Sequence, residues 1–120
     1  MAKILVVEDD KFLTSAYRAK LTKAGFETDT ASDGEEAIEK LKTSVPDIML
    51  LDLVMPRKDG FAVLKEVRGQ DNLKDLPIIV TSNLGQKEDM DKAKSLGATD
   101  YIIKSDMTME SLVDKVNSLL

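Results

Sequence analysis

The sequence predicts an α/β fold, a three-layer (βα)5 sandwich in which a parallel sheet lies between two layers of helices. Short apolar segments alternate along the 120 residues with longer amphipathic segments. The apolar segments are continuous, which is typical of strands buried on both faces of a parallel sheet. With short right-handed crossovers, this repeated strand–helix order folds into three layers.

Four apolar segments have the length and the β-branched content of strands. They are residues 4–7, 48–51, 78–80 and 101–103. A fifth segment, residues 27–31, is polar and is predicted to be an edge strand. Pro46 and Pro77 stand just before the third and fourth strands, where a missing N–H does least damage to the sheet.

Helical patterns separate these strands. From Leu13 to Ala24, apolar residues recur at helical spacing, and Gly25 follows as a C-terminal cap. Ser32 and Glu35 have the spacing of a capping box before the second helix. The remaining core-facing residues are predicted to be Ala37, Ile38 and Leu41; Phe61, Leu64 and Val67; Met90, Ala93 and Leu96; and Leu112, Val113, Val116, Leu119 and Leu120.

The composition excludes several classes of function. Without Cys there is no thiolate metal site, and without His there is no Ser-His-Asp triad and no phosphohistidine in this chain. A net charge of −5 argues against direct nucleic-acid binding. No apolar segment approaches the roughly 20 residues of a membrane span, and no signal-peptide pattern follows Met1, so we expect a cytoplasmic protein without a membrane partner.

Charged and hydroxyl side chains gather where the predicted strands end. They are Glu8, Asp9 and Asp10 after the first strand, Asp52 at the end of the third, Thr81 and Ser82 at the end of the fourth, and Lys104 at the end of the fifth. In open parallel sheets, ligands bind beyond these carboxyl ends. A carboxylate that attacks a phosphoryl group needs a divalent cation to reduce charge repulsion, and hard oxygen ligands favour Mg²⁺, with Mn²⁺ as the alternative. The pattern therefore predicts a phosphoryl-transfer site.

Along essentially its whole length, the chain resembles the receiver domains of bacterial two-component response regulators, of the chemotaxis-regulator type. The residues that carry the resemblance are Val6-Val7-Glu8-Asp9-Asp10, Leu51-Asp52-Leu53-Val54-Met55-Pro56 with Asp59-Gly60, Thr81-Ser82, Gly97-Ala98, Tyr101 and Lys104. The resemblance implies a flavodoxin-like sheet of order 2-1-3-4-5. We expect residues 1–120 to form one receiver domain with no output domain, because the last predicted helix ends at the chain terminus.

The resemblance also implies a role for each residue of the metal pocket. Asp52 is expected to be the phosphoacceptor and a ligand of Mg²⁺. Asp9 is expected to bind the metal directly, Glu8 through water, and Val54 through its backbone carbonyl.

The resemblance implies that the remaining site residues bind the phosphoryl group and change the surface that a partner protein binds. Ser82, which lies 22 residues before Lys104, has the separation typical of the family's switch hydroxyl. Lys104 is expected to bind the phosphoryl group, and Tyr101 occupies the position of the switch aromatic. Thr81 and Asn83 are secondary candidates.

The implied function is that of a phosphorelay signalling switch. A histidine kinase or a phosphotransfer protein would donate the phosphoryl group. A downstream protein would bind the face made by the fourth helix, fifth strand and fifth helix. The chain would be a monomer or a weak phosphorylation-dependent dimer. It would not be an enzyme, apart from self-catalysed phosphoryl transfer and autodephosphorylation.

Two residues depart from the family pattern. Ser105 replaces the proline that usually follows Lys104 across a cis bond, and Asn83 replaces the usual small residue after the switch hydroxyl. A non-proline cis bond costs about 3–4 kcal/mol. We therefore predict a trans peptide at Lys104–Ser105, with Lys104 still reaching Asp52.

Other interpretations compete with the switch. The three acids at positions 8–10 (Glu8, Asp9 and Asp10) could serve merely to complement the partial positive charge of a helix N-terminus. Lys104 could be a structural ion-pair partner, Ser82 a turn residue and Tyr101 half-buried packing.

Three rival functions follow from related folds and sites. An aspartate-nucleophile phosphatase would need a second Asp where Val54 stands. A nucleotide or flavin module would need a Gly-rich loop after the first strand, where three acids stand instead. A phosphorylation-independent pseudo-receiver used for docking would not need the intact acidic and basic set.

Overall fold

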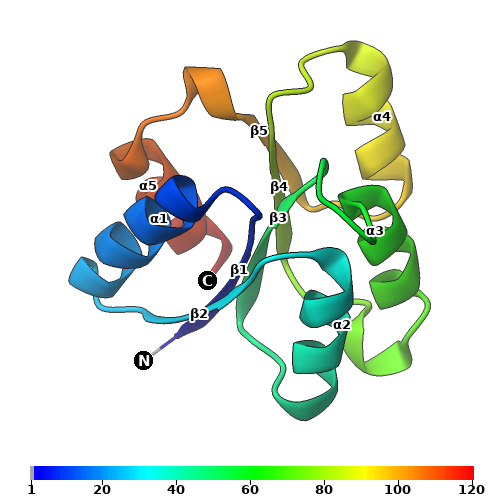
Figure 1. Cartoon of the computed structure of the whole chain (residues 1–120), viewed down its shortest axis with the longest axis horizontal. Coiled ribbons are helices and arrows are strands. Elements are labelled where there is room, and N and C mark those ends of the chain that lie inside the picture. Colours follow the sequence, from blue (N-terminus) through cyan, green and yellow to red (C-terminus); the bar gives the residue numbers. More distant parts are fainter. Residues whose placement is uncertain (1) are drawn as a thin grey trace.

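Five parallel strands form a single sheet at the centre of the molecule (Figure 1). The computed structural model describes residues 2–120. The strands are β1 (Lys3–Val7), β2 (Glu27–Ala31), β3 (Ile48–Asp52), β4 (Ile78–Ser82) and β5 (Asp100–Ile103). Their order across the sheet is β2-β1-β3-β4-β5. The predicted strands and their implied order are therefore confirmed.

Five helices cover the two faces of this sheet. They are α1 (Lys11–Lys23), α2 (Gly34–Thr43), α3 (Gly60–Arg68), α4 (Lys87–Ser95) and α5 (Met109–Leu119). Helices α1 and α5 lie on one face, and α2, α3 and α4 lie on the other (Figure 1). This arrangement is the predicted three-layer sandwich. In the described part of the chain, no helix has the length and apolarity that a membrane crossing requires.

The sheet separates two apolar cores. Side chains of β1, β3 and β4 point alternately to both faces and meet α1 and α5 on one side and α2, α3 and α4 on the other. Every residue of β3 and β4 is buried, whereas β2 is only partly buried, as its polar sequence predicts for an edge strand. Asp52 and Ser82 therefore stand at the ends of the two most deeply buried strands.

The cap of α2 differs from the prediction. Asp33 is the N-terminal cap, and its Oδ1 accepts a hydrogen bond from Glu36 N at 2.9 Å. Glu36 Oε1 accepts hydrogen bonds from the backbone N and the hydroxyl of Ser32 at 2.7 and 3.0 Å. The predicted Ser32–Glu35 capping box is therefore wrong by one residue. Either Ser32 or Asp33 could cap a helix, and the buried carboxylate of Asp33 takes this role.

The helices bury or half-bury most of the predicted core residues, but three are exposed. Ala16 on α1 and Ala24, the C-terminal cap of α1, are exposed, so their predicted core positions are wrong. Leu120 lies beyond the end of α5 and is 51% exposed, so its predicted core position is wrong. In α4 only Ala93 is fully buried, while Met90 and Leu96, the residue that caps the end of the helix, are half-buried. Helix α4 is thus the helix most weakly anchored by burial.

Candidate functional site

The carboxyl ends of β1, β3 and β5 bring two acidic side chains and one basic side chain together. Lys104 Nζ lies 2.6 Å from Glu8 Oε1 and 3.3 Å from Asp52 Oδ1. Both carboxylates are buried, and the side chain of Lys104 is 13% exposed. The prediction that Lys104 reaches Asp52 is confirmed, and its shorter contact is with Glu8.

Asp9 adds a third carboxylate to this group. One carboxylate oxygen each of Glu8, Asp9 and Asp52 lies within 4.8 Å of the others. Glu8 and Asp52 are buried and Asp9 is exposed, so the cluster opens to solvent on the side of Asp9. Hard oxygen donors at this spacing suit Mg²⁺, which binds a few carboxylates and keeps several waters. The donor set therefore fits the cation that the sequence predicts.

The charges of the cluster are not balanced by Lys104 alone. Burial raises the pKa of Glu8 to about 7, although the ion pair with Lys104 opposes the shift. Burial also raises the pKa of Asp52, again against the charge of Lys104. Desolvation lowers the pKa of Lys104, but its contacts with Glu8 and Asp52 outweigh this effect and leave the pKa raised. One ammonium thus serves two buried carboxylates beside Asp9, which leaves room for a cation.

These side chains line an open cavity of about 370 Å³. Its other lining residues are Asp10, Val54, Ser82, Asn83 and Leu84. Val54 is 61% exposed and contributes no polar side chain. The residue whose carbonyl is predicted to bind the metal therefore borders the same cavity as the carboxylates.

The two neighbouring hydroxyl residues of β4 have different surroundings. Consecutive strand residues point to opposite faces of a sheet. Ser82 lines the cavity, and its Oγ accepts a hydrogen bond from Leu84 N at 3.1 Å. Thr81 pairs with Asp52 in the strand register and is buried, but it is not among the described residues that line the cavity. The structure therefore favours Ser82 over Thr81 as the hydroxyl that serves the site.

Tyr101 contacts the site indirectly. It is 9% exposed in β5, and its hydroxyl donates a hydrogen bond to Leu84 O at 2.5 Å. Leu84 is thus bonded to Ser82 through its N–H and to Tyr101 through its carbonyl. Leu84 lies in the loop that joins β4 to α4. This loop connects the cavity to β5, while the switch role of Tyr101 stays a prediction.

The segment after β5 follows the predicted trans course. There is no cis peptide bond between residues 2 and 120, which includes the bond between Lys104 and Ser105. Residues Lys104–Asp106 form a 3₁₀ turn in which Met107 N donates to Lys104 O at 3.3 Å. The trans peptide and the ion pairs of Lys104 coexist, as the sequence predicts.

Two contacts in the connections after β1 and β3 give residues roles that the sequence left open or did not suggest. Asp10 Oδ1 accepts a hydrogen bond from Leu13 N at 3.1 Å, so this acid caps α1 while it lines the cavity. Arg57, in the loop after β3, pairs with the buried carboxylate of Asp33. These two residues are 24 positions apart in different connections, and no local spacing predicts the pair.

Comparison with known proteins gives a consistent result. The family model of the response regulator receiver domain matches residues 4–117. The chemotaxis protein CheY4 of Vibrio cholerae is 32% identical, with a TM-score of 0.94 over 100% of this chain and 99% of that chain. The response regulator protein TrrA of Thermotoga maritima, solved in complex with Mg(2+)-BeF, is 33% identical, with a TM-score of 0.87 over 100% of both chains.

A curated relative shows the same similarity over part of its length. The probable transcriptional regulator ycf27 of Cyanophora paradoxa is 36% identical over 118 residues, which are 98% of this chain and 48% of that protein. The chain spans about half the length of the curated relatives it matches.

Proposed function

The chain belongs to the response regulator receiver domain family, and on this premise we propose that it is a phosphorylation switch of a two-component system or phosphorelay. In this proposal, a histidine kinase or a phosphotransfer protein donates a phosphoryl group to Asp52 in a Mg²⁺-dependent reaction. One observation carries the proposal. The buried carboxylate of Asp52 ends a central strand with oxygens of Glu8 and Asp9 within 4.8 Å and the ammonium of Lys104 at 3.3 Å.

The proposed reaction is a direct transfer to a carboxylate. A carboxylate oxygen of Asp52 forms a bond to phosphorus while the bond from phosphorus to the donor's imidazole nitrogen breaks, and the released imidazole takes a proton from solvent. The charge of Lys104 favours the ionised form of Asp52, which is the nucleophile. Lys104 and the hydroxyl of Ser82 then each bind one phosphoryl oxygen.

The residues that would hold Mg²⁺ are the three acids and one backbone carbonyl. Asp9 and Asp52 would bind it through carboxylate oxygens, Val54 through its carbonyl and Glu8 through a water. When bound, the cation would supply positive charge that reduces the repulsion between Asp52 and the incoming phosphoryl group. Self-catalysed transfer and the later loss of the phosphoryl group to water are the only reactions that we propose.

Mass spectrometry after incubation with acetyl phosphate tests the proposal. The native chain should gain the mass of one phosphoryl group in the presence of Mg²⁺ and none in the presence of EDTA. Asp52→Asn should gain none, because the amide is not a nucleophile for phosphorus. Asp91→Asn, at an exposed acid of α4, is the control and should react as the native chain does. Equal labelling of Asp52→Asn would contradict the proposal, and an unlabelled native chain would favour a phosphorylation-independent docking module.

The proposed output is a shift of the face formed by α4, β5 and α5. Ser82→Ala should accept the phosphoryl group but lose most of this shift, because the hydroxyl no longer links the phosphoryl group to Leu84 and Tyr101. The coupling is expected to be about 1–3 kcal/mol. Amide NMR spectra recorded with and without phosphorylation measure the shift of this face. Ser44→Ala is the control at an exposed serine outside this face, and a Ser82→Ala spectrum that shifts like the native one would refute the model.

A further inference from the structure

The loop between β3 and α3, residues 53–59, supplies Val54 to the cavity but belongs to no strand or helix. Gly60 N donates a hydrogen bond to Leu53 O at 2.9 Å and closes the base of the loop. A Cβ on Gly60 would clash with Asp52 O, so only glycine permits this closure. The base is therefore fixed directly beside the proposed phosphoacceptor. Leu53 and Met55, on either side of Val54, are buried in the core, and the far end of the loop has its own attachment to α2.

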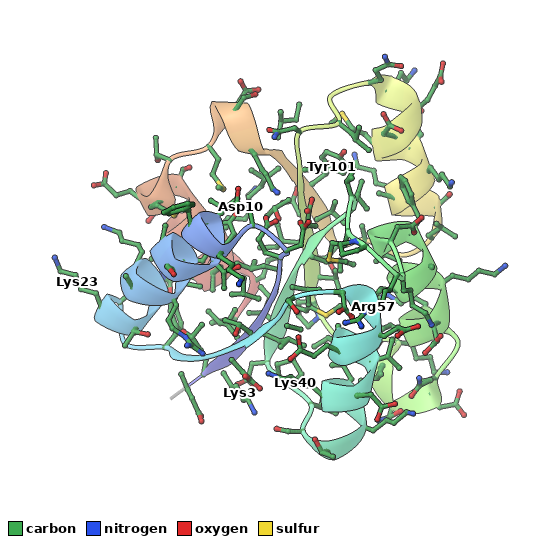
Figure 2. All side chains as sticks on the ribbon, viewed as in Figure 1. Lys3, Asp10, Lys23, Lys40, Arg57 and Tyr101 are labelled. Carbon is green, nitrogen blue, oxygen red and sulfur yellow. The ribbon has the colours of Figure 1, made fainter. Side chains whose placement is uncertain are left out.

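Arg57 provides that attachment. Its Nε donates to Asp33 Oδ2 at 3.1 Å, and its Nη2 pairs with the same oxygen. The side chain of Asp33 is only 3% exposed and also caps α2, whereas Glu35 lies 3.9 Å from Arg57 Nε and is 61% exposed. Figure 2 shows Arg57 beside the beginning of α2. The guanidinium thus joins the loop to a buried carboxylate on a different connection.

The backbone at this point is strained and closely packed. Arg57 has a φ of 65°, a conformation that non-glycine residues rarely adopt. Lys58 O packs so closely on the start of α2 that a Cβ on Gly34 would clash with it. Strained conformations persist only where surrounding contacts enforce them. The ion pair with Asp33, the longer contact with Glu35 and the close packing of Lys58 at Gly34 hold this part of the loop against α2.

We propose that Arg57 is a positioning residue for the metal pocket: its ion pair with Asp33 holds the loop in place and thereby fixes the carbonyl of Val54. The inference rests on the proposed function, in which that carbonyl binds Mg²⁺. A carboxylate ligand can adjust by rotating its side chain, but a backbone carbonyl cannot. The carbonyl of Val54 therefore moves only when the backbone of the loop moves. Mg²⁺ tolerates little departure from octahedral geometry, so a loosened loop weakens its binding.

NMR titration with MgCl₂ of the full chain tests this role. Arg57→Ala and Asp33→Asn should each weaken Mg²⁺ binding about tenfold, the size of effect typical of groups that orient a metal ligand. Arg57→Gly relieves the backbone strain but also removes the pair, so it should weaken binding as well. In Asp33→Asn the new amide oxygen would still accept the hydrogen bond of Glu36 N and cap α2. Glu35→Gln is the matched control, because it removes a neighbouring exposed charge but leaves the pair of Arg57 with the buried carboxylate of Asp33, and it should bind as the native chain does.

Amide hydrogen exchange of the metal-free chain gives a second measurement. In Arg57→Ala the amides of Lys58 and Gly60, which donate within the loop, should exchange faster, while those inside α2 keep their protection. Native Mg²⁺ affinity in Arg57→Ala and Asp33→Asn would overturn the inference alone, and the pair would then only stabilise the fold. A native chain that failed to bind Mg²⁺ would overturn the proposed metal site and this inference together.

Discussion

Replacing Lys104 with methionine is expected to destabilise the metal-free chain by about 3–5 kcal/mol, the usual cost of removing one partner from a buried ion pair. The ammonium is the cation nearest to two buried carboxylates, at 2.6 Å from Glu8 and 3.3 Å from Asp52. Methionine has a similar length but leaves both charges without a counterion. Urea denaturation in EDTA measures the difference in the free energy of unfolding.

The loss of stability in Lys104→Met should depend on pH in a defined direction. Burial raises the pKa of Glu8 from 4.5 to about 7 even with Lys104 present, and it raises the pKa of Asp52. Without the ammonium of Lys104, the pKa values of Glu8 and Asp52 should both rise further. An acid whose pKa is higher in the folded state binds protons more tightly there, so stability falls as the pH rises from the unfolded pKa through the folded one. The deficit of the variant should therefore be largest above about pH 7 and shrink towards pH 4.5.

Lys115→Met is the matched control for this prediction. Lys115 pairs with Asp100 at 2.9 Å, but both side chains are substantially exposed. Exposed ion pairs contribute about 0–1 kcal/mol, so the same substitution there should have a small effect. Equal losses in the two variants, or a deficit in Lys104→Met that grew at low pH, would show that the buried charges are not the cause.

Replacing Asp9 with asparagine is expected to have opposite effects on metal-free stability and on metal binding. The substitution removes one of three crowded negative charges, so the metal-free chain should gain up to about 1 kcal/mol, the repulsion of unit charges near 4 Å in water. It also removes a proposed direct ligand. Groups that only orient a ligand are worth about 10–100-fold in affinity, so the loss of Asp9 should cost at least about 100-fold.

Thermal unfolding with and without MgCl₂ measures both effects. For the native chain, Mg²⁺ at about 100 times its Kd should add about 2.7 kcal/mol of stability and raise the Tm. Asp9→Asn should show a higher Tm in EDTA and almost no response to Mg²⁺. Asp10→Asn is the control. It makes the same change one residue later, at an acid that caps α1, where asparagine preserves the cap. A native response to Mg²⁺ in Asp9→Asn would remove Asp9 from the metal pocket.

The sequence predicts the sheet and the meeting of charged strand ends, because both follow from patterns that are local along the chain. Continuous apolar segments identify β1, β3 and β4, and parallel pairing then places Asp52 beside the other strand ends. The pattern of β4 does not decide between Thr81 and Ser82, since both end the same strand. The separation typical of the family selected Ser82, and the alternation of strand side chains explains why only one of the two lines the cavity.

What the sequence could not predict depends on contacts between distant connections. The choice between Ser32 and Asp33 as the cap of α2 is linked to Arg57, which binds the same buried carboxylate. The closer contact of Lys104 with Glu8 than with Asp52 depends on the exact path of a long side chain. Both features are set by tertiary packing, and neither leaves a periodic signal.

The sparse burial of α4 has a consequence for the free energy at which this helix unfolds locally. Unfolding this helix locally would expose little apolar surface, because Ala93 is its only fully buried residue. Segments with few buried contacts open at a free energy far below that of global unfolding. Helix α4 therefore belongs to the least cooperative part of the native ensemble, although it is joined to the cavity through Leu84. A small local free energy at that loop can redistribute the conformations of α4 while the sheet stays intact.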